Sequence, residues 1–185
     1  MEISRRLQAL QKTMREDGVE AWLLFTSDPH LSEYLPDYWK LREYFSGFTG
    51  SAGTLMVLKE RAYLWTDSRY WVQAEKELEG TGIVLQKQGL ANTLSYTELL
   101  LQTLPQGSRV ALLGETISVE LFYQLEESLE EGEIELITHL NPFHTLWEHR
   151  PDLPLAPIYR HKDEFIAKNR VEKLSYLREV MAREG

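Results

Sequence analysis

The chain has 185 residues, 43% of them hydrophobic and 11% aromatic, so it is long and apolar enough to bury one sizeable core. Its net charge is −9, with basic residues scattered along the chain, which argues against a nucleic-acid partner because phosphate binding depends on clustered Lys and Arg. It lacks cysteine, a run of about 18 apolar residues and a secretory leader, so we expect a cytoplasmic protein without disulfides and without a membrane partner.

The chain opens with patterns typical of a helix and a buried strand. Apolar residues along residues 2–17 follow one another at spacings of four, three and four, and Gly18 comes next as a stop. This predicts an amphipathic helix. Residues 20–26 are an apolar run too short for a helix, which predicts a strand buried on both faces.

The middle of the chain predicts a hairpin followed by a helix. Residues 54–58 and 62–65 are two apolar runs, and the three residues between them suit an antiparallel hairpin turn. We expect Asp67 or Ser68 to cap the next helix, which closes at Gly80. Further elements are predicted in this order: strand 83–86, helix 93–104, strand 109–113, helix 119–131 and strand 134–137.

The alternation of strands and helices predicts an α/β fold with a mixed sheet and helices on both of its faces. Near Trp147 the composition changes, and residues 150–157 contain three prolines, which predicts an extended linker. Residues 163–183 carry a second apolar helical stripe with nothing after Gly185 for it to cover. We therefore interpret the chain as a fragment of a longer protein.

The stretch GFTGSAGT, residues 47–54, raises the question of a phosphate cradle. It has neither the G-x-G-x-x-G spacing of a dinucleotide site nor the G-K-[ST] ending of a P-loop, and it leads into a strand instead of a helix. Glycine also permits positive φ and close approach of two backbones. We interpret the stretch as a tight loop that enters an inner strand.

The chain offers little for metal binding or nucleophilic catalysis. The five histidines are His30, His139, His144, His149 and His161. None of them has the H-E-x-x-H spacing of a zinc helix, and cysteine ligands are absent. The G-x-S-x-G pattern of a nucleophile elbow is also missing. We predict no metal ligand and no catalytic residue in this chain.

Arg69 stands out for its place in the segment from Trp65 to Trp71. In the first turn of the expected helix, a cation opposes the helix dipole by a few tenths of a kcal/mol, so local stability does not explain it. Residues that break a local rule often have a function. The alternative is an ordinary surface arginine paired with a carboxylate such as Glu33 or Glu43.

Four motifs together resemble a known family. They are Ser27-Asp28-Pro29-His30, Ser32-Glu33-Tyr34, the glycine stretch preceded by Ser46, and Trp65-Thr66-Asp67-Ser68-Arg69-Tyr70. In this order and spacing, the chain resembles the amino-terminal domain of aminopeptidase P, the Xaa-Pro aminopeptidase of the creatinase/prolidase group. The resemblance covers the whole chain, including Trp147, Arg150 and Pro151 of a Trp-x-x-Arg-Pro motif.

The resemblance implies a fold and a parent activity. The fold is a mixed sheet of about six strands flanked by helices, with a ribonuclease H-like motif. Residues 1–150 would form the amino-terminal domain, 151–162 the linker, and 163–185 a helix that begins the next domain. Parent enzymes are cytoplasmic homodimers that remove the residue preceding proline from peptides, with two divalent metal ions, usually Mn²⁺, bound beyond residue 185. The fragment alone would then be inactive.

The resemblance also implies a site. Arg69 matches the family's peptide-contacting arginine, whose planar guanidinium donates paired hydrogen bonds. His30, Glu33 and Tyr34 match a motif that supports the loops beside the cleft. Ser68 stands where relatives often have Gly, and residues 36–39 lack the cysteines of some animal members, which leaves the subgroup open. We expect a bacterial-type enzyme; the alternatives are a free-standing interaction or regulatory domain, or a prolidase or creatinase relative.

Overall fold

The computed structural model describes residues 2–185. The chain divides into two compact units, of which the first ends at Leu153 and the second spans Pro154–Gly185. Each unit is described by itself.

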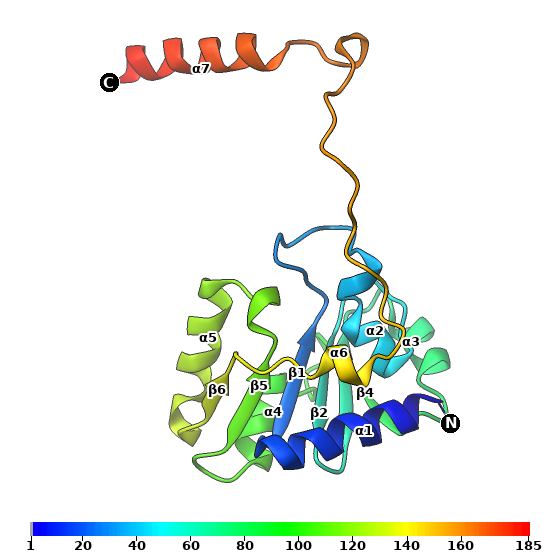
Figure 1. Cartoon of the computed structure of the whole chain (residues 1–185). Helices are drawn as coiled ribbons and strands as arrows, with labels where there is room; N and C mark the ends of the chain where they lie inside the picture. Colours follow the sequence, from blue (N-terminus) through cyan, green and yellow to red (C-terminus); the bar gives the residue numbers. More distant parts are fainter. Residues whose placement is uncertain (1) are drawn as a thin grey trace. The chain divides into compact units, whose positions relative to one another are not determined.

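The first unit is built on one mixed sheet of six strands, in the order β4-β3-β2-β1-β5-β6 (Figure 1). The strands are β1 (Ala21–Phe25), β2 (Thr54–Leu58), β3 (Ala62–Thr66), β4 (Ile83–Lys87), β5 (Arg109–Leu112) and β6 (Glu135–Ile137). Strand β2 runs antiparallel to both of its neighbours, β1 and β3. The pairs β3–β4, β1–β5 and β5–β6 are parallel. The hairpin and the mixed sheet expected from the sequence are confirmed.

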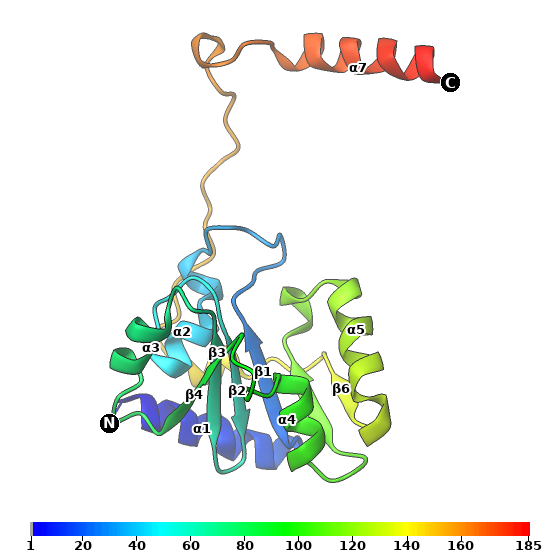
Figure 2. The same cartoon turned by 180° about the vertical axis from the view of Figure 1, so that it is seen from behind.

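Helices cover both faces of this sheet. The face in front in Figure 1 carries α1 (Glu2–Asp17), α2 (Leu41–Ser46), α3 (Trp71–Glu77) and α6 (Phe143–Leu146). The opposite face, in front in Figure 2, carries α4 (Tyr96–Thr103) and α5 (Val119–Leu129). Short 3₁₀ turns lie at Asp37–Trp39, Gly114–Thr116 and Glu130–Gly132.

Strand β1 shows why the core has two halves. Successive side chains of a strand point to opposite faces. Trp22 and Leu24 therefore enter the core under α1, α2 and α6, whereas Ala21 and Leu23 enter the core under α4 and α5. Because both faces are covered, the strand is apolar at every position, as the short run in the sequence predicts.

Two helix starts differ from the expectation. Helix α3 begins at Trp71, and neither Asp67 nor Ser68 caps it; Tyr70 occupies the cap position without a side-chain hydrogen bond. Helix α4 begins at Tyr96 instead of residue 93, because Ser95 and Glu98 form a reciprocal capping box.

The second unit holds one long helix. Helix α7 (Arg170–Glu184) begins seven residues later than expected, because Asn169 accepts hydrogen bonds from the amides of Val171 and Glu172. A short 3₁₀ turn precedes it at Asp163–Phe165. No helix of residues 2–185 is both long enough and apolar enough to cross a membrane.

Candidate functional site

The topology brings the predicted site residues to one edge of the sheet. Strands β1 and β3 each run antiparallel to β2, so they point the same way and end at the same edge. His30, Glu33 and Tyr34 follow β1, and Arg69 follows β3. In α/β sheets, ligands bind beyond the carboxyl ends of the strands.

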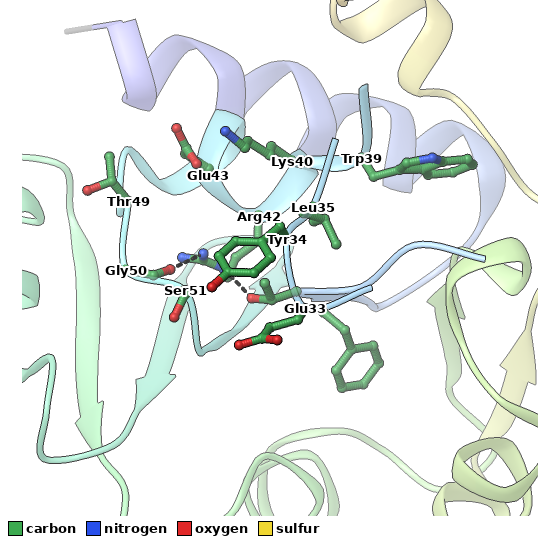
Figure 3. A pocket seen from close by; sticks show the side chains of 12 residues that line it. Glu33, Tyr34, Leu35, Trp39, Lys40, Arg42, Glu43, Thr49, Gly50 and Ser51 are labelled. Atoms are coloured by element: carbon green, nitrogen blue, oxygen red, sulfur yellow. Dashed lines mark hydrogen bonds between the residues drawn. The ribbon is translucent and has the colours of Figure 1, made fainter. Parts of the chain in front are cut away.

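A pocket of about 240 Å³ lies at this edge (Figure 3). Glu33 and Tyr34 line it, whereas His30 and Arg69 do not. The other lining residues are Phe25, Thr26, Leu35, Trp39, Lys40, Arg42, Glu43, Thr49, Gly50 and Ser51. Tyr34 is 85% exposed, so the wall that it forms is open to solvent.

Asp28 holds the loop that carries Glu33 and Tyr34. Its side chain is buried, and Oδ1 accepts hydrogen bonds from the amides of His30 (2.9 Å) and Ser32 (3.0 Å). Burial alone would raise the pKa of Asp28, but these hydrogen bonds outweigh it and lower the pKa. Leu31, between the two amides, has a φ of 53°. His30 thus takes part in the site through its backbone, while its side chain is exposed.

Arg42 is the central residue of this edge, and sequence reasoning missed it. It is only 4% exposed. Nε donates to Oγ1 of Thr26 (2.7 Å), and Nη2 donates to the carbonyl of Gly50 (Figure 3). Nη1 donates to the carbonyl of Phe48 (2.9 Å). Burial lowers the pKa of Arg42 to about 10, so the guanidinium stays charged at neutral pH. Its neighbours in the sequence include the charged residues Lys40 and Glu43, so the local pattern gave no signal of this burial.

The glycine stretch is a loop folded around this cation. Two of its carbonyl oxygens face Arg42, whereas a phosphate cradle presents amide hydrogens. Gly47 has a φ of 74° and ends α2, and a Cβ on Gly53 would lie 2.9 Å from the carbonyl oxygen of Trp65. The hydroxyls of Thr26 and Thr66 donate to the carbonyls of Gly53 and Ala52. The expected tight loop into an inner strand is therefore confirmed.

Arg69 is ordered by its neighbour Asp67. Nε and Nη2 donate to the two carboxylate oxygens of Asp67 at 2.9 and 2.8 Å, although the arginine side chain is 68% exposed. The sequence-based alternative of a surface arginine paired with a carboxylate therefore describes its surroundings, although the partner is Asp67 and not Glu33 or Glu43. Arg69 also lies before the first residue of α3, so the helix dipole that seemed to oppose it does not act on it as expected.

The pocket is equipped to bind but carries no metal cluster. Lys40 is paired with Asp37 at 2.6 Å, whereas Glu33 and Glu43 have no ion-pair partner within residues 2–185. In the same part of the chain, no group of three or more His, Asp or Glu side chains is placed to hold a metal ion. The arrangement offers hydrogen bonds, charge and an apolar wall to a ligand.

The family profile of the creatinase/prolidase N-terminal domain matches residues 6–144. The chain belongs to this family. Xaa-Pro aminopeptidase 2 of Rattus norvegicus is 32% identical over 95% of this chain, and Xaa-Pro aminopeptidase 1 of Dictyostelium discoideum is 31% identical over 99%. The chain spans only 26% and 30% of the length of these two relatives.

Solved structures agree with the family. The X-prolyl aminopeptidase of Caenorhabditis elegans, described as a cytosolic enzyme with a di-nuclear active site, covers 99% of this chain with a TM-score of 0.83 and 27% identity. The chain covers 31% of that enzyme. The N-terminal domain of the cytoplasmic peptidase PepQ from Mycobacterium tuberculosis shares the fold, with a TM-score of 0.55 and 23% identity over 77% of this chain and 98% of its own. These matches leave the bacterial type a prediction.

Proposed function

We propose that this chain is the amino-terminal domain of a Xaa-Pro aminopeptidase, a peptidase that removes the residue preceding proline from the amino terminus of peptides. The observation that carries the proposal is the match to the C. elegans enzyme over nearly the whole chain, at a TM-score of 0.83. Relatives with the same activity in their names support it. The domain itself has no catalytic role in this proposal.

The proposed reaction takes place on two divalent metal ions, expected to be Mn²⁺. Residues 2–185 hold no cluster of metal ligands, so the proposal assigns both ions to the part of the enzyme that follows this chain. Such ions would act there as Lewis acids on the peptide carbonyl and would activate water for attack. In this proposal, the domain orients the peptide and supports a homodimer. The enzyme acts in the cytoplasm, which the description of the C. elegans enzyme as cytosolic favours.

Within this proposal, Arg69 binds the peptide. Asp67 takes the Nε and Nη2 hydrogens, which fixes the plane of the guanidinium and leaves Nη1 without an acceptor in residues 2–185. An exposed, pre-oriented donor suits a peptide carbonyl or carboxylate. Glu33 and Tyr34 form the adjacent pocket wall, and His30 supports their loop.

The test is Arg69→Ala in the full-length enzyme, with tripeptides and longer peptides that carry proline in the second position. Losing a hydrogen bond from a charged donor costs about 1.5–3 kcal/mol, so we expect kcat/KM to fall by about tenfold to a hundredfold, with metal content and fold unchanged. Arg15→Ala is the control, because this partly exposed arginine pairs with Glu60 in the β2–β3 turn, at the opposite edge. Unaltered peptide kinetics in Arg69→Ala would remove Arg69 from the site.

Two alternatives are separated by simple observations. A stop codon directly after residue 185 would favour a free-standing interaction or regulatory domain, and a continuation with metal ligands would favour the peptidase. Assays with Xaa-Pro dipeptides, Xaa-Pro tripeptides and creatine distinguish an aminopeptidase from a prolidase or a creatinase.

A further inference from the structure

We propose that Arg42 is a positioning residue for substrate binding: through the loop of residues 48–52 it holds Tyr70, and so sets the place of Arg69. The inference rests on the proposed role of Arg69 and adds the element that fixes it. Arg42 touches no substrate in this scheme.

The first step runs from Arg42 to the loop. The carbonyls of Phe48 and Gly50 accept hydrogen bonds from two different nitrogens of the buried guanidinium, and the ring of Phe48 lies 4.8 Å from its Cζ. Thr26, at the end of β1, accepts from the third nitrogen and donates to Gly53. The guanidinium therefore fixes the loop relative to the sheet.

The second step runs from the loop to Tyr70. The hydroxyls of Ser51 and Tyr70 are 2.6 Å apart, and the rings of Phe48 and Tyr70 meet edge to face with centroids 6.1 Å apart. A Cβ on Gly50 would lie 2.3 Å from the Phe48 ring and 2.8 Å from the Tyr70 ring. Nothing larger than glycine fits between these groups, so a shift of the loop is transmitted to Tyr70.

The third step runs from Tyr70 to Arg69. Tyr70 is the cap residue of α3, and its ring lies 5.1 Å from the Cζ of Arg69. The loop is also fastened to α3, because the amide and hydroxyl of Thr49 donate to the two carboxylate oxygens of Glu77 at 2.8 and 2.7 Å. The loop is thus connected to both ends of α3, through Tyr70 at the start, next to Arg69, and through Glu77 at the end.

Lysine cannot replace arginine in this role. The three acceptors lie on a hydroxyl and two backbone carbonyls, and the planar fork of arginine reaches them with three separate nitrogens. An ammonium keeps the charge but has one nitrogen. Arg42→Lys is therefore the variant that removes positioning with the least change in charge and volume.

The deciding experiment is a double-mutant cycle in the full-length enzyme on a proline-containing tripeptide. We expect Arg42→Lys to lower kcat/KM about tenfold in the wild-type background and to change it less than about twofold when Arg69→Ala is already present. Tyr70→Phe, which keeps the ring but loses the bond to Ser51, should show the same pattern with a loss of about three- to tenfold. Equal losses in both backgrounds, or no loss in the wild type, overturn the positioning role.

Hydrogen exchange on the 185-residue chain gives a readout that does not depend on peptidase activity. Arg42→Lys should speed exchange at the amide of Thr49 and at the start of α3, while α5 keeps its protection. The matched control is Arg109→Lys, because Nη1 of Arg109 also donates to two backbone carbonyls, those of Asp17 and Gly18, at the opposite edge of the sheet. Unchanged exchange at the start of α3 contradicts the inference. Suppose instead that Arg69→Ala leaves the peptide kinetics unchanged while Arg42→Lys speeds exchange at the start of α3. This result would refute the role of Arg69 and leave the coupling between the loop and α3 intact.

Discussion

Replacing Arg42 by methionine tests whether the buried guanidinium stabilises the domain. The variant keeps an unbranched chain of similar length but removes the charge and all three donors. The carbonyls of Phe48 and Gly50 then lose their donor, whereas Thr26 keeps its bond to Gly53. Two opposing effects decide the outcome.

The first effect is the cost of burying the charge. The lowering of the pKa of Arg42 to about 10 corresponds to roughly 3 kcal/mol, which an apolar side chain would not incur. The second effect is hydrogen bonding. Three bonds from a charged donor contribute about 1.5–3 kcal/mol each, which together come to about 4.5–9 kcal/mol. Hydrogen bonding therefore outweighs the cost of burial, and we expect Arg42→Met to lower the free energy of unfolding by about 1.5–6 kcal/mol.

Urea unfolding of the 185-residue chain measures this change, because Trp22 and Trp65 lie in the two halves of the core and report on it by fluorescence. Arg5→Met is the control, since Arg5 is exposed and its replacement should cost less than about 0.5 kcal/mol. A variant of Arg42 as stable as the wild type, or more stable, would contradict the reasoning. It would mean that the burial cost exceeds the hydrogen bonding, as happens when some buried ion pairs are replaced by apolar groups.

Two further predictions concern the loop after β1 and the end of the first unit. Because the pKa of Asp28 is lowered in the fold, its carboxylate stabilises the fold at neutral pH, and this stabilisation is lost as the pH falls below about 4. Asp28→Asn should therefore lower the free energy of unfolding by about 1 kcal/mol at pH 7 and by less at pH 3. Urea midpoints of the variant and the wild type that run parallel across this pH range would contradict the prediction. Phe143 is fully buried, so Phe143→Ala should lower the free energy of unfolding, measured in urea, by about 3–5 kcal/mol. The control Val119→Ala, at an exposed site, should lower it by less than about 0.5 kcal/mol. A loss below about 1 kcal/mol for Phe143→Ala would show that α6 does not pack tightly against the core.

Local patterns were sufficient for most of the fold. The spacing of Leu7, Leu10 and Met14 predicted the buried stripe of α1, and all three are in the core. The short apolar runs predicted the strands, and the three-residue turn predicted the antiparallel pair β2–β3. These features depend on periodicity and chain length alone, which are properties of neighbouring residues.

The site was predicted less completely. Glu33 and Tyr34 do line the pocket, and the topology places Arg69 at the same edge. Yet the pattern around Asp67 suggested a helix cap, when its carboxylate instead holds the backbone and guanidinium of Arg69. A short polar side chain near a helix start suits either a cap or a local turn, and only the backbone path decides between them.

The amino-acid sequence by itself determined the order of the elements, the glycine loop and the family to which the chain belongs. Only the tertiary structure decided that Arg42 lies buried with three acceptors around its guanidinium. An arginine on a short helix is usually exposed. Its burial depends on groups from β1 and from residues 48 and 50 converging on one point, and such convergence has no local signature in the chain.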